Sequence, residues 1–300
     1  MKLTVTFSAG SLSATRAGVI AGMTNTLENQ LSNQPVVLIT GASSGVGQCT
    51  AGLLSQKGYK VFGTTRHLAS AEAIPAVEML ALDVRADDSV AACVKAAGGE
   101  IGRIDVLVNN AAYELAGALE ETSMEEAKAQ FETNFFGVVR MVKAVLPAMR
   151  QHKQGRIINI SSLSGVSSIP FMGIYSASKF ALEGYTQALR LEVSPFNIHV
   201  SLVEPGFLKT PMMNKRQVST AQLEQYDRWR QRSFNAIRDQ EQKAPGPELV
   251  AQTVLNILAS KVPRLRNVIG SQAKFATRLQ RFLPEGAYER GVRSTFRLDK

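Results

Sequence analysis

The sequence has few cysteines, few histidines and no long hydrophobic run. Its two cysteines, Cys49 and Cys93, lie in separate periodic segments, so neither a disulfide framework nor a Cys-x-x-Cys zinc site is expected. The three histidines are scattered and show no metal-ligand spacing. No apolar run reaches the roughly 18–20 residues that span a bilayer. These absences predict a soluble, cytoplasmic protein that binds no metal.

Most of the chain also has little net charge. The 300 residues carry 34 Lys and Arg against 25 Asp and Glu, a formal charge of +9, which raises nucleic acid, acidic membranes and phosphate-bearing ligands as partners. Residues 261–300 hold ten of these cations and three of the acids, so they carry +7 and the first 260 residues only +2. Because the excess is C-terminal, nucleic-acid binding is not predicted. The basic amphipathic stretch there is expected either to contact an acidic membrane surface peripherally or to pack its apolar side on the domain or on a second subunit.

From Pro35 onward, short β-branched runs alternate with segments of helical period, which is typical of βαβ units and a parallel sheet. The sequence therefore predicts an α/β fold: a Rossmann-type, doubly wound, seven-stranded parallel sheet flanked by helices. The expected strands are Val36–Thr40, Lys60–Thr65, Val77–Leu82, Ile104–Asn109, Arg156–Ile160, Ile198–Val203 and Asn267–Ile269. The expected helices are Val46–Lys57, Asp88–Gly98, Met124–Gln151 (two helices or one bent helix), Tyr175–Val193 and Pro247–Ala259.

These patterns divide the chain into one domain with two extensions. Residues 1–34, with little periodicity, are expected to form a loosely ordered extension, a targeting peptide, or a segment upstream of a functional start at Met23. Residues 35–270 form the predicted catalytic domain, in which residues 211–246 are an insertion that contains the polar segment Glu224–Gln242. Residues 271–300 are the basic C-terminal extension, with an amphipathic stretch at Gln272–Leu283.

A glycine-rich turn directly follows the first strand, in the order Gly41-Ala-Ser43-Ser44-Gly45-Val46-Gly47. Gly41 permits a sharp exit from the strand, Gly45 lets a pyrophosphate approach the backbone, and Gly47 allows close packing of the following helix. The N-terminal N–H groups of that helix favour phosphate charge. A strand-to-helix turn can use glycine for turning alone, but this position favours a dinucleotide site.

The end of the second strand indicates which dinucleotide is bound. An acid about 20 residues after the glycines reads a 2′-hydroxyl, whereas an arginine pairs with a 2′-phosphate. The sequence there is Gly63-Thr64-Thr65-Arg66, without an acid, so NADPH is predicted over NADH, unless Arg66 is simply a solvated strand-end residue. After the third strand, Asp83 and the adjacent Val84 are placed to contact adenine, although Asp83 is equally suited to a cap or turn.

A tyrosine and a lysine four residues apart, Tyr175 and Lys179, open a long helical segment. About one helical turn separates them, so their side chains share a face. The ammonium of Lys179 is expected to lower the pKa of Tyr175 from about 10 towards working pH, as a general acid/base requires. Thirteen residues upstream, Ser162 follows a predicted strand, where its hydroxyl can steady a carbonyl or alcohol oxygen.

Together these motifs make the sequence resemble the short-chain dehydrogenase/reductase family from Pro35 to about Gly270. The turn from Thr40 to Gly47 resembles the family's Thr-Gly-x-x-x-Gly-x-Gly motif. Asn109-Asn110-Ala111-Ala112 resembles its Asn-Asn-Ala-Gly, except that Ala112 replaces a glycine and leaves less room beside a cofactor. The segment Pro205-Gly206-Phe-Leu-Lys-Thr210 resembles its nicotinamide loop.

The resemblance implies a chemical role for individual residues. It implies hydride transfer between nicotinamide and a carbonyl or carbinol carbon, with Tyr175 as proton donor in reduction and Ser162 as hydrogen-bond donor to the substrate oxygen. Lys179 would bind the nicotinamide ribose, and Asn134 would position a water that leads protons to Lys179. The residues implied to contact the cofactor are Gly41, Ser43, Ser44, Gly45, Val46, Gly47, Arg66, Asp83, Val84, Asn110, Tyr175, Lys179, Pro205, Gly206 and Thr210.

Substrate specificity is expected from the loops beyond the strand ends, at Ser164–Ile174 and after Thr210. They contain Phe171, Met172, Phe207, Met212 and Met213. These side chains suit a bulky apolar substrate such as a steroid, retinoid or long-chain ketone. Packing in the protein core would explain them almost as well. The chain looks most like the branch with 17β-hydroxysteroid and retinol dehydrogenases, which implies a homodimer or homotetramer.

Other functions remain open from the sequence. Within the same family, the alternative is a ketoacyl or small-carbonyl reductase. Outside it, a sugar-nucleotide epimerase or dehydratase shares Tyr-x-x-x-Lys but usually spaces its first turn as Gly-x-x-Gly-x-x-Gly. A non-catalytic NADP-sensing regulator often lacks one of the four catalytic residues, and all four are present here.

Overall fold

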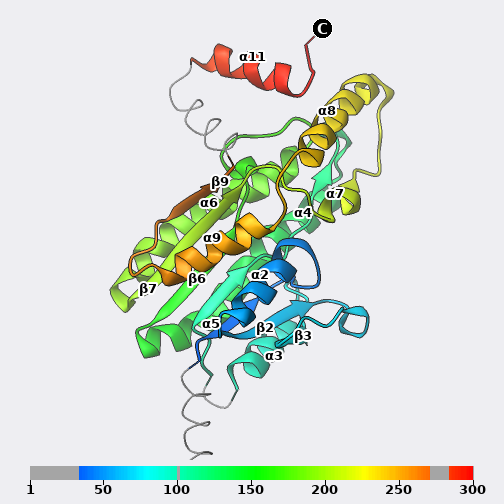
Figure 1. The fold of residues 1–300 in the computed structure, drawn as a ribbon. Helices are drawn as coiled ribbons and strands as arrows, with labels where there is room; N and C mark the ends of the chain where they lie inside the picture. The colour runs from blue at the N-terminus through cyan, green and yellow to red at the C-terminus, as the bar shows by residue number, and fades with distance from the viewer. Residues whose placement is uncertain (1–33, 100–101, 271–283, 300) are drawn as a thin grey trace, which may run out of the picture. The chain divides into compact units, whose positions relative to one another are not determined.

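The structure is a computed structural model that describes residues 34–99, 102–270 and 284–299 (Figure 1). Residues Val36–Lys300 form one compact unit, which is separate from Met1–Pro35. The extension expected over residues 1–34 lies, apart from its last residue, outside the described residues, as does the amphipathic stretch Gln272–Leu283.

A seven-stranded, fully parallel sheet forms the centre of this unit, in the order β3-β2-β1-β4-β6-β7-β9 (Figure 1). This confirms the predicted fold class. The strand order reverses between β1 and β4, which creates the crevice at the strand ends where such sheets bind ligands. The strands are β1 (Val36–Ile39), β2 (Lys60–Thr65), β3 (Val77–Ala81), β4 (Val106–Asn109), β6 (Gly155–Ile160), β7 (Ile198–Pro205) and β9 (Arg266–Ile269).

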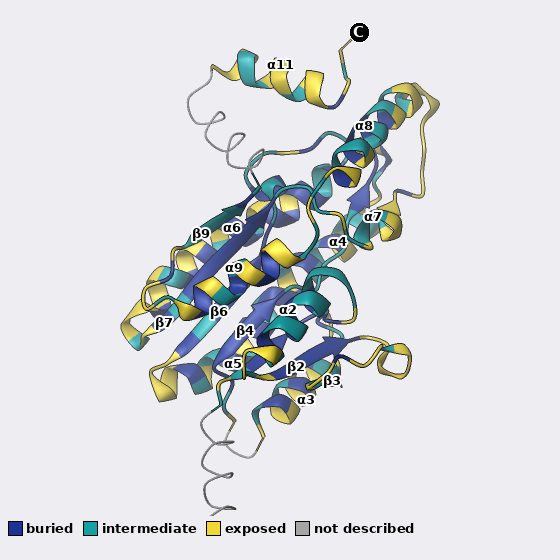
Figure 2. Ribbon diagram, viewed as in Figure 1, coloured by how far each residue is buried: buried dark blue, intermediate teal, exposed yellow. Residues whose placement is uncertain are grey.

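Two layers of helices cover the sheet, because successive strand residues point to opposite faces. Leu38 faces α3 (Asp87–Gly98), α5 (Gly137–His152) and α6 (Gly173–Val193) within one fully buried cluster. Val37 and Ile39 face the other way, towards α2 (Gly45–Gln56) and α9 (Glu248–Ala259). The five inner strands are accordingly buried over almost their whole length, whereas the edge strands β3 and β9 are mostly half-buried and the helices expose one side (Figure 2). This double coverage explains why the strands are nearly continuous apolar runs.

The segment expected as two helices or one bent helix consists of α4 (Met124–Phe131) and α5, joined by a π-helical turn over Glu132–Phe136. Ser123 caps α4, since its hydroxyl accepts from the Glu126 N–H while the Glu126 carboxylate accepts from the Ser123 N–H. A π-turn holds one residue more than an α-helical turn, and such turns are frequent at functional sites.

The insertion between β7 and β9 is more ordered than the sequence predicted. It contains α7 (Met212–Lys215), the two-residue strand β8 (Gln217–Val218) and the 19-residue helix α8 (Glu224–Gln242). β8 pairs in parallel with β5 (Leu115–Ala116) in a small second sheet. Strands of two residues are too short to show a periodic pattern. They tie the insertion to the segment that follows β4.

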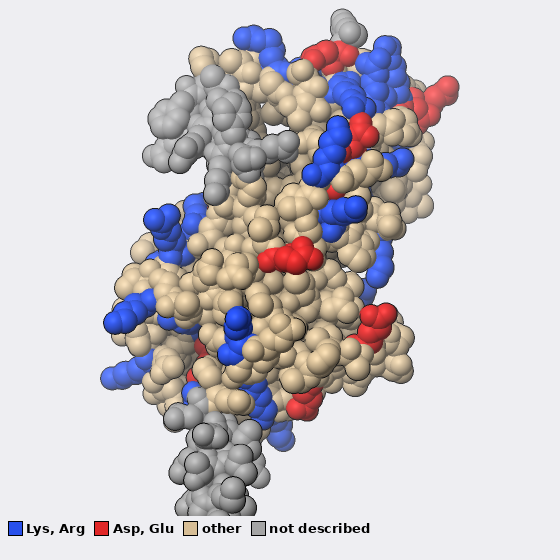
Figure 3. All heavy atoms as spheres, in the orientation of Figure 1, with Lys and Arg blue, Asp and Glu red and all other residues tan. Residues whose placement is uncertain are grey.

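The C-terminal segment forms α11 (Glu285–Thr295), which contacts the insertion. Phe296 is buried beside Ile237 of α8, and Arg297 forms an ion pair with Asp239 at 2.6 Å. Part of the C-terminal charge excess is therefore paired locally. On the face shown in Figure 3, Lys and Arg side chains are separated by uncharged surface, with acidic groups among those near α8.

Within the described residues, no helix is long and apolar enough to span a membrane, and no group of His, Cys, Asp and Glu side chains is arranged to hold a metal ion. Both cysteines are free thiols, and burial raises the pKa of Cys93 to about 11.

Candidate active site

A cavity of about 450 Å³ lies at the carboxyl ends of the strands. The turn after β1 forms one wall, and the other walls include the segments after β2, β3, β4, β6 and β7, the start of α6 and the end of α8. All the predicted site residues line it except Gly47 and Asn134. Those that do are Gly41, Ser43, Ser44, Gly45, Val46, Arg66, Asp83, Val84, Asn110, Ser162, Tyr175, Lys179, Pro205, Gly206 and Thr210.

The glycine turn has the backbone geometry that the sequence predicted. Gly41 and Gly45 adopt φ of +68° and +57°, in the left-handed region that favours glycine. Gly47 lies behind the turn, where an added Cβ would overlap the Gly41 carbonyl oxygen and lie 2.6 Å from Asn110 Nδ2. Gly47 therefore permits the close packing of α2, while Gly41 and Gly45 shape the cavity wall.

The turn is held in place by Thr40 and Asn110. The Asn110 side-chain amide donates to the carbonyls of Thr40 and Gly41, at 3.0 and 2.9 Å, and the Thr40 hydroxyl accepts from the Asn110 and Ala111 N–H groups. The Ser44 side chain does not cap α2, and the first turn of α2 contains no acid. The N-terminus of α2 is thus left free to accept an anion from the cavity.

Two guanidinium groups lie at the β2–β3 end of the cavity. Arg85, which sequence reasoning missed, binds both carboxylate oxygens of Asp83, and this hydrogen bonding lowers the pKa of Asp83 to about 2. Arg66 has no ion pair or hydrogen bond with the described residues, although it acts electrostatically on Asp83. Arg66 is consequently available for an anionic ligand, whereas both oxygens of Asp83 are already engaged.

Tyr175, Lys179 and Ser162 meet in the middle of the cavity. Tyr175 and Lys179 are both almost fully buried, and the Lys179 ammonium lies 6.0 Å from the centre of the Tyr175 ring. Lys179 Nζ donates to the Ile160 carbonyl at 2.9 Å, and the Ser162 hydroxyl accepts from the Ser164 N–H at 3.1 Å. β6 and α6 thus bring the predicted catalytic side chains to one place.

Burial and the nearby Glu114 carboxylate raise the pKa of Tyr175, and a hydrogen bond with Ser162 acts in the opposite direction. The expected lowering of this pKa is therefore wrong for the protein without a ligand, because desolvation by burial is the largest effect on the Tyr175 hydroxyl. Burial also lowers the pKa of Lys179 to about 8, although Glu114 and Glu183 oppose this. Tyr175 is accordingly protonated at neutral pH.

Asn134 lies in the π-turn and does not line the cavity. Its side-chain oxygen accepts from the Tyr113 N–H at 3.1 Å, and its Nδ2 donates to the Tyr113 carbonyl at 3.0 Å and to the Ser178 hydroxyl at 3.3 Å. Asn134 therefore fixes the chain next to Glu114 and joins it to the catalytic helix.

A largely buried charged triad that the sequence did not reveal also lines the cavity. Arg216 forms ion pairs with Glu114, at 2.7 Å, and with Glu241. The three residues belong to the segment before β5, the segment before β8 and the end of α8, so no local pattern links them. Burial raises the pKa of Glu241, and Arg216 opposes the rise.

The apolar part of the lining includes Ile169, Met172, Phe207, Met212 and Met213. Four of the five apolar residues predicted to face substrate are thus in the cavity. Phe171 is not: it adopts φ of +61° and its ring packs edge-on against Tyr226 of α8, 6.4 Å away.

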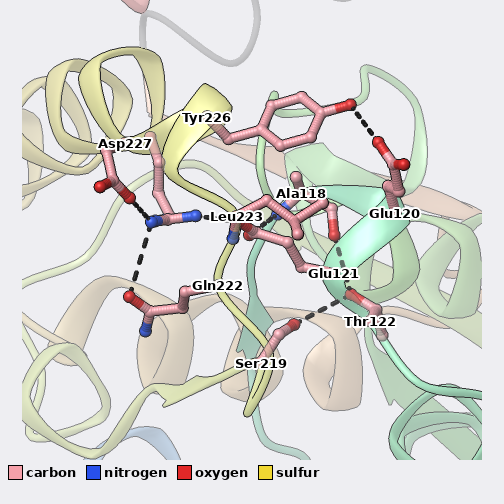
Figure 4. Close-up of polar contacts among 10 residues, drawn as sticks. Ala118, Glu120, Glu121, Thr122, Ser219, Gln222, Leu223, Tyr226 and Asp227 are labelled. Atoms are coloured by element: carbon pink, nitrogen blue, oxygen red, sulfur yellow. Dashed lines mark hydrogen bonds and ion pairs between the residues drawn. The ribbon is translucent and has the colours of Figure 1, made fainter.

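A second polar cluster fixes α8 beside this cavity (Figure 4). The fully buried carboxylate of Glu121 accepts from the N–H groups of Ala118 and Leu223, both at 2.8 Å, and pairs with the Arg230 guanidinium. At the edge, the Tyr226 hydroxyl donates to Glu120, and the hydroxyls of Thr122 and Ser219 share a hydrogen bond. We refer to Glu121 and Arg230 as the α8 anchor.

The family model described as short chain dehydrogenase matches residues 35–220, which include the glycine turn, Ser162, Tyr175 and Lys179. The chain belongs to the short-chain dehydrogenase/reductase family. It is an NAD(P)-dependent oxidoreductase, as its fold and the match together show.

Similar short-chain dehydrogenases include proteins named for lipid substrates. A 3-ketodihydrosphingosine reductase of Bacteroides thetaiotaomicron is 45% identical over 86% of this chain and 96% of its own length. Human retinol dehydrogenase 8 is 38% identical over 87% of this chain and 89% of its own. A short-chain dehydrogenase structure from Streptomyces avermitilis is 31% identical, with a TM-score of 0.73 over 86% of this chain and 99% of its own.

Proposed function

We propose that this short-chain dehydrogenase uses NADPH to reduce a ketone or aldehyde on a bulky, largely apolar substrate, and catalyses the reverse oxidation when the alcohol is in excess. The observation that carries the proposal is the meeting of Tyr175, Ser162 and Lys179 in one cavity with the glycine turn. That arrangement places a proton donor, a hydrogen-bonding hydroxyl and a cation within reach of a dinucleotide site.

Each side chain contributes in a way that follows from its surroundings. Tyr175 is buried and protonated at neutral pH, so it holds the proton that a developing alkoxide requires. The Ser162 hydroxyl is positioned by the Ser164 N–H and hydrogen-bonds the same substrate oxygen. Lys179 supplies positive charge beside Tyr175. When bound, NADPH supplies the hydride.

The cavity also supports the choice of cofactor. The uncapped N-terminus of α2 and the backbone of the glycine turn suit a pyrophosphate. Arg66 has no other partner among the described residues and suits a 2′-phosphate, and the end of β2 has no acid to bind a 2′-hydroxyl.

The substrate class rests on the apolar side chains around Met172 and Phe207 and on the relatives. Two of these are named a 3-ketodihydrosphingosine reductase and a retinol dehydrogenase, names that both refer to long, mostly apolar molecules. A long-chain lipid carbonyl therefore fits this chain better than a small polar ketone.

The test is NADPH consumption with ketones and aldehydes of graded chain length, for the wild type and for Tyr175→Phe. Removing the proton donor is expected to reduce kcat by roughly 10²–10⁴-fold, with NADPH binding retained. Tyr185→Phe removes a hydroxyl from the same helix outside the cavity and serves as the control. Near-normal turnover by Tyr175→Phe, or no turnover of any carbonyl by the wild type, would refute the proposal.

A further inference from the structure

We propose that Glu183 is a positioning residue for catalysis: its buried carboxylate holds Lys179 in the charged ammonium form and thereby sets the upper pH limit of carbonyl reduction. This inference rests on the proposed function, in which the Lys179 ammonium supplies positive charge beside Tyr175. The proposed function gives Glu183 no role, although its side chain is only 4% exposed.

The first support is the position of Glu183 on the catalytic helix. Glu183 follows Lys179 by four residues on α6, so the two side chains lie on one face, about one turn apart. The Lys179 ammonium donates to the Ile160 carbonyl at 2.9 Å, and the next residue is Ser161. A Cβ on Gly165 would lie 2.9 Å from the Ser161 hydroxyl oxygen and 3.0 Å from Glu183 Cγ. Glu183 therefore lies beside the short segment that the ammonium binds.

The second support is the incomplete pairing of Glu183. Its Oε2 accepts from Arg266 Nη1, which also donates to the buried Glu204 at 2.8 Å. Its Oε1 is buried, and no described residue donates to it in the geometry of a hydrogen bond, although the nearby Ser161 hydroxyl favours the charged form. Two buried carboxylates thus share one guanidinium nitrogen. When both are ionised, Lys179 one turn away offsets part of the second negative charge.

The third support is the order in which these groups lose their protons. Burial and the Glu204 charge raise the pKa of Glu183 to about 7, although Arg266 opposes the rise. Burial lowers the pKa of Lys179 to about 8, and the charges of Glu114 and Glu183 oppose that fall. Glu183 is therefore ionised before Lys179 loses its proton, so its charge is present in the pH range where the ammonium depends on it.

The charge on Lys179 matters when Tyr175 gives up its proton. The tyrosinate that remains is buried, and a nearby ammonium stabilises it. Glu114 acts on Lys179 as well, but it is paired with Arg216, whereas Glu183 keeps Oε1 free. Loss of the Glu183 charge should therefore reach the reacting hydroxyl through Lys179.

The first experiment measures the protonation of Lys179 without turnover. The NMR shift of a lysine ε-carbon changes when Nζ loses its proton, and the variant Lys179→Met identifies the signal in lysine-labelled protein. We expect a midpoint at about pH 8 in the wild type. In Glu183→Gln the midpoint should be lower by roughly 0.5–1 pH unit, because a neutral amide does not favour the ammonium. Equal midpoints in the two proteins would overturn the inference.

The second experiment compares kcat/KM for a long-chain ketone at about pH 6, below the pKa of Glu183, and at about pH 8.5, above that of Lys179. The ratio of Glu183→Gln to the wild type should fall roughly threefold to tenfold between the two pH values, since the variant loses the ammonium at lower pH. A purely structural defect would reduce activity by the same factor at both. A ratio that stays constant would therefore contradict the inference.

Glu204→Gln is the matched control, because Glu204 is also buried and bonds the same Arg266 nitrogen, yet its charge does not act on Lys179. The Lys179 midpoint should stay at its wild-type value in this variant, and a decrease as large as in Glu183→Gln would contradict the inference. Glu183→Asp keeps the negative charge and should restore most of the wild-type pH dependence. Circular dichroism verifies that each variant is folded.

The two experiments separate this inference from the proposed function. If ketones are reduced but Glu183→Gln leaves the Lys179 midpoint unchanged, the inference fails and the proposed function stands. If the wild type reduces no carbonyl, the proposed function fails, and the NMR titration alone decides whether Glu183 holds the charge on Lys179.

Discussion

The two ends of the cavity are held together by different means. At the cofactor end, backbone groups and small side chains decide the geometry: Gly47 packs against the turn, and Asn110 bonds two of its carbonyls. At the substrate end, charged side chains join segments distant in the sequence, through the α8 anchor and the Arg216 triad. The difference teaches that backbone packing leaves no room for a side chain at Gly47, whereas the geometry of the other end depends on ion pairs between distant segments.

The largest effect is expected from Gly47→Ala at the cofactor end. The added Cβ would overlap the Gly41 carbonyl, and overpacking against backbone costs about 3 kcal/mol, or a loss of about 100-fold in NADPH affinity. Fluorescence titration with NADPH measures it. Gly184→Ala is the matched control, since a Cβ there meets nothing within 4 Å and alanine favours a helix. If Gly47→Ala and Gly184→Ala bound NADPH equally well, the close packing at Gly47 would not determine the geometry of the cofactor end.

Breaking the α8 anchor should affect only the substrate end. Glu121→Gln leaves the buried Arg230 facing a neutral partner and is expected to cost roughly 2 kcal/mol, confined to α8 and the segment before it. Hydrogen exchange of α8 amides should accelerate and KM for the carbonyl should rise, while NADPH affinity stays the same.

The control for the anchor is Asp227→Asn. Asp227 also pairs with Arg230, but its side chain is 58% exposed, so the loss should stay below about 1 kcal/mol. A drop in NADPH affinity with Glu121→Gln would mean that the two ends are not independent.

The variant Arg66→Ala tests whether Arg66, in the cofactor end of the cavity, binds the 2′-phosphate of NADPH. Loss of a charge-assisted bond to a 2′-phosphate should lower kcat/KM for NADPH by roughly tenfold or more and leave the value for NADH unchanged. Steady-state kinetics with both cofactors measure the ratio, with Lys95→Ala as an exposed control on α3. If Arg85→Ala rather than Arg66→Ala shifts the ratio, the phosphate is read by the other guanidinium.

The last prediction concerns Glu183, a buried carboxyl group of α6, the helix that also carries Tyr175 and Lys179. Burial and Glu204 raise the pKa of Glu183 from 4.5 to about 7, although Arg266 opposes this. The folded state thus holds the proton more tightly, and the free energy of unfolding should fall as the pH rises between these two values.

Glu183→Gln should remove this pH dependence. Relative to the wild type, the variant is expected to gain roughly 1–3 kcal/mol between about pH 5 and about pH 8. Urea unfolding at the two pH values measures the gain, and Glu78→Gln, an exposed carboxylate on β3, should show none. If the free energies of unfolding of variant and wild type differed by the same amount at both pH values, the pKa of Glu183 would not be raised in the folded state.

The sequence predicted the strands and the glycine turn well because their determinants are local. The seven strands are continuous apolar runs, and the glycine turn, Ser162, Tyr175 and Lys179 each lie in a short motif next to a predicted strand or helix. Roles carried over by resemblance, such as a water held by Asn134, remain predictions, as do the NADPH preference and the oligomeric state.

The substrate end could not be predicted, because its determinants depend on contacts between distant segments. The buried residues of α8 include Arg230, Ser233 and Glu241 beside Ala236 and Ile237, so charged and polar side chains interrupt its apolar stripe. Arg216 is 102 residues from Glu114. The pKa of Tyr175 also rises because of burial, which depends on the folded structure rather than on the spacing to Lys179.

The π-turn at Glu132–Phe136 makes the position of Glu114 in the cavity wall depend on the number of residues in this helical segment. Deleting one residue there would restore a regular α-helix and rotate Asn134 by about 100° relative to one of its flanking helices. Asn134 would then release both backbone groups of Tyr113, the residue before Glu114. The loss of a single codon would thus displace Asn134 and change the substrate end, while Ser162, Tyr175 and Lys179 lie on other elements.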